Sequence, residues 1–229
     1  PTAVHTQMKI MDRKAKRYNR LFPTGIPVVG NNLAGRAKEI EKIKLLLKNG
    51  QSVILHGPRR IGKTSLALTI LNELKKEGIF TGHVDIFECA TLQVLSQRIT
   101  ETTLENKKLS KIVRSIKENL SQAFKNIEIK QTVNDYEWML KFAGDSNDKD
   151  ELFSNVLDFP EKFAKKNNIP MIMFIDEIGD IEKFNGGNLI KMMRSKFQLH
   201  AHVTYLFAGS HESVIENIFV DKTGPFYRF

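Results

Sequence analysis

Cysteine is almost absent from this sequence, and a long hydrophobic run is missing altogether. Cys89 is the only cysteine among 229 residues, so an internal disulfide is impossible and a reducing interior is expected. Because it follows an apolar run, we expect Cys89 to be a core or edge residue rather than a nucleophile. No apolar run approaches the ~20 residues that cross a bilayer, and no signal peptide is visible. These absences favour a cytoplasmic protein without a membrane association.

Internal repeats and low-complexity tracts are absent as well. Hydrophobic residues make up 41% of the sequence and charged residues 27%, which is typical of an ordinary globular protein. The length allows one large domain, or one domain and part of a second. Since the first residue is proline rather than methionine, we expect the natural start of the chain to lie upstream.

The sequence is strongly basic, with 35 Lys and Arg against 26 Asp and Glu, a net charge of +9. Part of this excess can meet a polyphosphate. Another part gathers near the N-terminus, in Lys9, Arg13, Lys14, Lys16, Arg17 and Arg20. Such a run either tracks a nucleic-acid backbone or forms a solvated arm, and the sequence leaves both open. We divide the chain into a basic N-terminal arm and linker (1–30) and a folded core (31–229).

The most informative segment is residues 57–64, which reads GPRRIGKT and matches the phosphate-binding pattern G-x-x-x-x-G-K-[ST]. Residues 52–56 before it have the length and β-branched content of a buried strand, and residues 65–74 after it have the apolar spacing of a helix. A strand, a glycine loop and a helix in this order form a nest of backbone N–H groups that binds anions. The sequence therefore predicts a nucleoside triphosphate site.

Individual residues of this loop have distinct expected roles. Gly57 and Gly62 allow the backbone to wrap closely around a phosphate. Lys63 would reach the β- and γ-phosphates, and Thr64 would place its hydroxyl on Mg²⁺. The expected nucleotide-contacting set in the loop is Gly57, Pro58, Arg59, Arg60, Ile61, Gly62, Lys63, Thr64 and Ser65.

A second landmark is residues 171–175, a continuous apolar run that indicates a strand buried on both faces of a parallel sheet. It ends in Asp176 and Glu177, and carboxylates at this end of such a strand lie beside the phosphate loop. We expect Asp176 to hold Mg²⁺ through its water shell and Glu177 to act as general base on the attacking water. The alternative is an acidic pair that only caps the next helix.

A last strand is expected over residues 203–208, and it leads to a polar residue, Ser210. Ser210 is our candidate for contacting the γ-phosphate or the lytic water, with His211 second. The alternative is that Ser210 is only the N-cap of a helix over residues 212–218.

The remaining elements are assigned from periodicity and breaker residues. Helices are expected over residues 37–48, 91–125 and 151–166, and a second strand over residues 80–87. A hairpin or irregular excursion is expected over residues 127–142. Whether residues 91–150 form a recognition surface or only pack against the core is left open.

A guanine-specific protein is not supported. Residues 176–179 fit the D-x-x-G of GTPases, but such proteins also carry an N-K-x-D loop. The near match at residues 106–109 lacks the essential carboxylate and lies in an expected helix. A small-molecule kinase uses the same phosphate loop. It rarely needs an Asp-Glu pair at the end of one strand and a further polar residue at the end of the next, so an ATPase is favoured.

Together these motifs resemble those of AAA+ and STAND ATPases, in particular the archaeal-type ATPases. Residues 33–40 are similar to the F-x-G-R-x-x-E-[LI] box that precedes the P-loop, with Leu33 in place of the usual aromatic residue. Residues 57–65 match the G-x-R-R-x-G-K-T-S form of the loop. The Asp-Glu pair at 176–177 matches the Walker B motif, and residues 207–210 resemble the sensor strand. The tail from 217 to 228 resembles the segment that follows it.

The resemblance implies an α/β fold, a P-loop NTPase three-layer sandwich with a parallel sheet of strand order 5-1-4-3-2 and a helical lid. The fifth strand and the lid are expected to be missing from this chain. The resemblance also implies that Arg36 lies on the adenine side of the nucleotide, with residues 28–29 nearby. An arginine finger acts on such sites in the family, and Arg194 and Arg228 are the candidates for it.

The activity implied is Mg²⁺-dependent hydrolysis of ATP by a domain that works as a motor or switch on a macromolecular partner. DNA, another protein and a second copy of the chain are the candidate partners. Two alternatives stay open. One is a slowly hydrolysing regulatory module that is read through its ATP or ADP state. The other is a nucleic-acid-binding protein that relies mainly on its basic arm.

Overall fold

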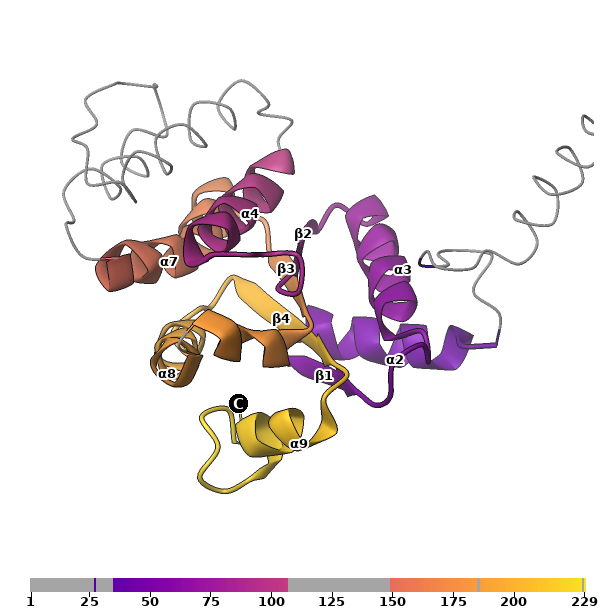
Figure 1. Cartoon of the computed structure of the whole chain (residues 1–229). Coiled ribbons are helices and arrows are strands. Elements are labelled where there is room, and N and C mark those ends of the chain that lie inside the picture. Colours follow the sequence, from indigo (N-terminus) through magenta and orange to yellow (C-terminus); the bar gives the residue numbers. More distant parts are fainter. Residues whose placement is uncertain (1–26, 28–34, 107–148, 185, 228) are drawn as a thin grey trace, which may run out of the picture.

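The computed structural model describes residues 27, 35–106, 149–184, 186–227 and 229 (Figure 1). The basic N-terminal arm, the hairpin expected over residues 127–142 and the part of the expected helix beyond residue 106 lie outside the described residues. Within the part described, no helix has both the length and the apolar character needed to cross a membrane.

The centre of the fold is a four-stranded parallel sheet (Figure 1). Its strands are β1 (Val53–His56), β2 (Phe80–Asp85), β3 (Met171–Asp176) and β4 (Val203–Gly209). Their spatial order, β1-β4-β3-β2, confirms the 1-4-3-2 part of the predicted sheet, and no fifth strand pairs with β1 in the described ranges. β3 and β4 are buried along their whole length, as their uninterrupted apolar sequences predict.

Helices cover both faces of this sheet and complete a three-layer sandwich (Figure 1). They are α2 (Ala37–Lys48), α3 (Lys63–Lys76), α4 (Leu92–Glu105), α7 (Lys149–Asn167) and α8 (Gly186–Phe197). α2 and α3 form one apolar core with Ile172 and Phe174 of β3. α4, α7 and α8 form the other core with Met173 and Ile175. Successive residues of β3 serve opposite layers, because side chains alternate between the two faces of a strand.

Several element boundaries differ from expectation. β2 ends at Asp85 rather than at residue 87, because the Asp85 carboxylate accepts a hydrogen bond from the Phe87 N–H at 2.9 Å and turns the chain. The last helix is also shorter than predicted. α9 (Glu212–Ile215) passes into a π-helical turn at Glu216–Val220, so residues 212–218 are not one α-helix. The prediction for Cys89 is confirmed, since this residue is buried in the core.

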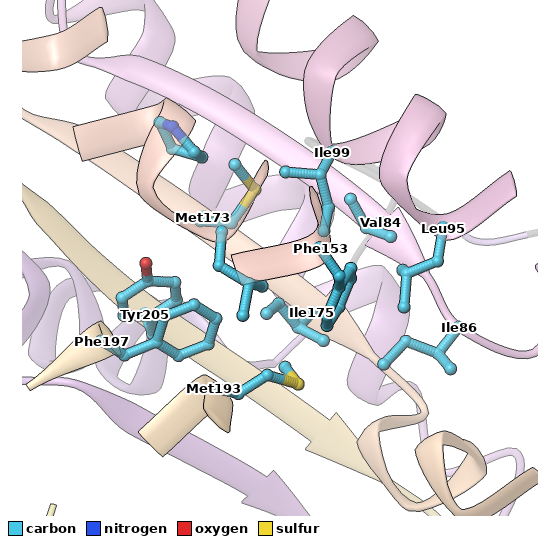
Figure 2. A pocket seen from close by; sticks show the side chains of 12 residues that line it. Val84, Ile86, Leu95, Ile99, Phe153, Met173, Ile175, Met193, Phe197 and Tyr205 are labelled. Atoms are coloured by element: carbon cyan, nitrogen blue, oxygen red, sulfur yellow. The ribbon is translucent and has the colours of Figure 1, made fainter. Parts of the chain in front are cut away.

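A small apolar cavity of about 20 Å³ lies between the sheet and the α4–α7–α8 layer (Figure 2). Phe153, Met173, Met193 and Tyr205 are among the residues that line it. This volume is close to that of a single water molecule, and the walls offer almost no polar partner. The cavity is therefore a packing gap in the core.

Candidate active site

The loop of residues 57–62 joins the C-terminal end of β1 to the first turn of α3. Two glycines give the loop its shape, because Gly57 has φ 138° and Gly62 has φ 86°, values that disfavour a side chain. Gly62 is the N-cap of α3, and its carbonyl accepts the Leu66 N–H at 2.9 Å. The loop therefore delivers its backbone N–H groups directly to a helix N-terminus, where anions bind favourably.

Lys63 is the first residue of α3, and its side chain folds back into the loop. Its Nζ donates hydrogen bonds to the carbonyl oxygens of Gly57 at 2.7 Å and Pro58 at 2.9 Å. The residue is buried, with 8% of its surface exposed. The two carbonyls thus hold a positive charge inside the curve of the loop, next to the helix N-terminus.

Thr64 and Asp176 join the loop to the end of β3, although they are 112 residues apart in the sequence. Thr64 Oγ1 donates to Asp176 Oδ2 at 2.7 Å, and the Glu177 N–H donates to Asp176 Oδ1 at 3.0 Å. Burial raises the pKa of the Asp176 carboxyl, and these two hydrogen bonds act in the opposite direction. The predicted pair of metal-binding residues is therefore brought together.

This pair fits Mg²⁺, which takes oxygen ligands and keeps several waters instead of using an all-protein cage. The hydroxyl oxygen of Thr64 has free lone pairs while its proton is donated to Asp176. No group of three or more His, Cys, Asp or Glu side chains suited to a metal exists among the residues that the structure describes. A divalent ion at this edge would thus depend on a phosphate ligand as well as on these two side chains.

Glu177 and Ser210 meet across the ends of β3 and β4. Glu177 Oε2 accepts hydrogen bonds from the Ser210 N–H at 3.0 Å and from Ser210 Oγ at 2.8 Å. Glu177 has φ 48°, a sparsely populated conformation for a residue with a side chain, which is typical of functional sites. The helix N-cap is His211 and makes no side-chain cap hydrogen bond, so the alternative of Ser210 as a mere N-cap is wrong.

Arg59 connects the loop to the same cluster. Its Nε donates to Ser210 Oγ at 3.3 Å, and its Nη2 lies 3.3 Å from His211 Nε2. The sequence pattern placed Arg59 only among the phosphate-loop residues. Its contact with the end of β4 is a feature that only the folded chain creates.

Residues 33–227 match the family described as an ATPase domain predominantly from Archaea. The chain belongs to this family. The P-loop, the Asp-Glu strand end and the polar end of β4 are thus parts of an archaeal-type P-loop ATPase domain. No curated protein gives a match to the sequence.

Three solved structures share the fold of this ATPase domain. The Walker-type ATPase of Pyrococcus abyssi is 17% identical, with a TM-score of 0.58 over 90% of this chain and 54% of that chain. The ORC1 protein of Aeropyrum pernix in complex with DNA is 15% identical, with a TM-score of 0.55 over 91% and 47%. The ORC2 protein of the same organism, in ADPNP-ADP complexes, is 14% identical, with a TM-score of 0.52 over 86% and 46%. The chain spans about half the length of each.

Arg36 contacts the phosphate loop through one hydrogen bond. Its Nη1 donates to the Ile61 carbonyl oxygen at 3.3 Å, and its Nε pairs with Glu39 Oε2 at 2.6 Å. Arg36 therefore touches the loop from the N-terminus of α2. Residues 28–29, the other part of the expected adenine side, lie outside the described residues.

Of the two arginine-finger candidates, Arg194 lies away from this site. Arg194 lines a groove with Ser52 and Val203, which lie at the N-terminal ends of β1 and β4, the opposite edge of the sheet from the phosphate loop. Its guanidinium lies 4.8 Å from the centre of the Phe229 ring. Arg228 lies outside the described residues.

Two residues of β2 adjoin the site and were not predicted. Asp85 pairs in register with Asp176, and burial, together with neighbouring carboxylates, raises its pKa to about 6 against a hydrogen bond from Phe87. Burial lowers the pKa of His83, and its Nε2 is a buried atom without a hydrogen-bond partner. The sequence pattern that could have indicated them is the alternation of buried and less buried residues along β2. It places the polar residues 81, 83 and 85 on one face of the strand.

Proposed function

We propose that this ATPase domain binds ATP with Mg²⁺ and hydrolyses it, and that the cycle drives a motor or switch acting on a macromolecular partner. The observation that carries the proposal is the 2.7 Å hydrogen bond between Thr64 and Asp176. It unites the phosphate loop with the carboxylate strand end, which are the two halves of a Mg²⁺–nucleotide site. The domain division into residues 1–30 and 31–229, and an AAA+ or STAND type for the core, belong to the same proposal.

In this proposal the phosphate loop binds the polyphosphate chain. The backbone N–H groups of residues 59–65 and the α3 dipole attract the β- and γ-phosphates. Lys63 exchanges its two carbonyl partners for phosphate oxygens, which are stronger acceptors because they are charged. Arg36 would lie on the adenine side of the nucleotide, and its contact with the Ile61 carbonyl ties it to the loop.

Thr64 and Asp176 would hold the Mg²⁺ ion, which neutralises phosphate charge when it is bound. Glu177 would take a proton from the attacking water, and Ser210 would hold the Glu177 carboxylate in the position for this step. Positioning and electrostatics do most of the work in phosphoryl transfer, so a carboxylate held by two donors is suited to the role.

The test is Mg²⁺-dependent ATP turnover of the wild-type chain beside Lys63→Ala and Glu177→Gln. We expect Lys63→Ala to lose ATP binding and Glu177→Gln to keep binding but lose turnover. Lys75→Ala and Glu182→Gln are matched controls, because these side chains are exposed on α3 and after β3. Turnover that persists in Glu177→Gln would refute the base assignment, and a wild-type chain that binds no nucleotide would refute the proposal.

A nucleic-acid partner is favoured by the charge of the sequence. The net charge is +9, and six Lys and Arg residues fall between positions 9 and 20. The fold likeness to an ORC1 protein in complex with DNA makes DNA the first partner to try. We expect DNA affinity to fall steeply with salt and to be lost when these six residues are neutralised. Turnover that rises with DNA would indicate a DNA-coupled ATPase, and unchanged slow turnover would favour a regulatory switch.

A further inference from the structure

His83 lies beside the carboxylate strand end without a role in the proposed reaction. Its imidazole stacks on the Phe174 ring, with centroids 4.8 Å apart and planes inclined by 12°. Its backbone N–H donates to Thr102 Oγ1 at 2.9 Å, which ties β2 to α4 at this position. The backbone bond therefore fixes the strand at this residue, and the aromatic stack fixes the ring.

One atom of this ring has no partner. His83 Nε2 is buried without a hydrogen bond and lies 4.0 Å from Asp176 Oδ2. Buried polar atoms are almost always hydrogen-bonded, so an orphan nitrogen aimed at a site residue calls for an explanation. The carboxylate oxygen that it faces accepts a bond from Thr64 and has a further lone pair.

We infer that His83 is a positioning residue of the Mg²⁺ site, whose Nε2–H donates to Asp176 Oδ2 when the Mg²⁺–nucleotide is bound. This inference rests on the proposed function. A shift of about 1 Å would bring the two atoms within hydrogen-bond distance. His83 would then keep the carboxylate in place while Thr64 turns its hydroxyl oxygen toward the ion. Such outer partners orient metal-binding groups and set their affinity.

The test uses Mn²⁺ as the probe, with an ATP analogue that has a non-hydrolysable β–γ bridge. His83→Phe keeps a ring to stack on Phe174 but has no donor. His83→Gln places an amide N–H near the Nε2 position, and His83→Asn carries the same amide one methylene short of it. The last two lose the stack equally, so they differ only in the reach of the donor.

We expect His83→Phe and His83→Asn to weaken Mn²⁺ binding to the nucleotide complex about tenfold, measured by electron paramagnetic resonance. His83→Gln should stay within about threefold of wild type, because it restores the donor. Affinity for the analogue in EDTA should be the same in all four proteins, since His83 acts only through the metal site. A merely structural role would lower both affinities together.

Four results would overturn the inference. Mn²⁺ affinity of His83→Phe and His83→Asn equal to wild type would remove any role of the donor. If His83→Gln and His83→Asn weakened Mn²⁺ binding equally, His83 would be only a packing residue. The same would follow if the variants also weakened binding of the analogue in EDTA. A wild-type chain that binds no Mn²⁺–nucleotide would overturn the proposed function as well, whereas a wild type that binds and variants that match it would overturn this inference alone.

Discussion

Glu161 of α7 forms a carboxylate clamp that anchors the start of β4, and we expect its loss to destabilise the whole sandwich. Its Oε2 accepts the N–H groups of His202 at 2.8 Å and Val203 at 3.1 Å. Its Oε1 accepts the Ala201 N–H at 3.1 Å and lies 2.7 Å from His202 Nδ1. The Glu161 side chain is only 16% exposed, so these interactions are little screened by solvent.

Glu161→Gln should lower the free energy of unfolding by about 3 kcal/mol. The amide oxygen would keep the bonds from His202 and Val203 as neutral hydrogen bonds, each weaker than the charged one by about 1 kcal/mol. The amide NH₂ would then face the Ala201 N–H, donor against donor, which costs about another 1 kcal/mol.

The assay is urea unfolding of both proteins at pH 7, with the midpoint and the slope fitted separately. Glu151→Gln is the matched control on the same helix, because this residue is exposed, and it should change stability by less than about 0.5 kcal/mol. A loss for Glu161→Gln that is no larger than the control would refute the clamp as a source of stability.

The same clamp predicts the direction of a pH effect. Burial by itself raises the pKa of Glu161, but the hydrogen bonds from His202 and Ala201 outweigh it and lower the pKa below 4.5. A carboxyl with a depressed folded pKa stabilises the protein above its unfolded value, and this stability is lost as the pH falls through the folded pKa. The difference between wild type and Glu161→Gln should be full at pH 7 and shrink below pH 4.5. A difference that grows on acidification would contradict the sign.

Three further variants test the site. Thr64→Val removes the donor to Asp176 and should weaken Mg²⁺-dependent ATP binding about tenfold or more, with little change in EDTA; an equal loss in EDTA would contradict a metal role. Ser210→Ala removes one of two donors to Glu177 and should lower kcat about tenfold at unchanged ATP affinity; a kcat equal to wild type would leave Ser210 without a catalytic part. Gly62→Ala forces a side chain into φ 86° and should cost about 1 kcal/mol in urea unfolding and also weaken ATP binding; an unchanged midpoint would show that the loop tolerates a side chain there.

Much of the fold could be predicted from local patterns, because each of these patterns is short and self-contained. The uninterrupted apolar runs at β3 and β4 are typical of strands buried on both faces of a parallel sheet. The glycine loop at residues 57–62 needs only its own φ angles and the following helix to form. The match of α2 to residues 37–48 follows from a clear helical period and a stop at residues 49–50. The predicted end of the last helix was wrong, because a π-helical turn follows α9. Packing, and not local propensity, decides where such a helix ends.

The identities of the phosphate-loop and carboxylate residues were therefore determined by the amino-acid sequence, together with the edge of the sheet at which they stand. Their contacts were decided by tertiary structure alone. Whether Ser210 caps a helix or binds Glu177, and whether Arg59 reaches β4, depends on how two strand ends meet in space. His83 faces Asp176 only because β2 pairs in register with β3, and no spacing along the chain encodes that pairing. The hydrogen bonds that connect the phosphate loop and the strand ends join residues that are distant in sequence. The geometry of the site therefore exists only once the sheet has formed.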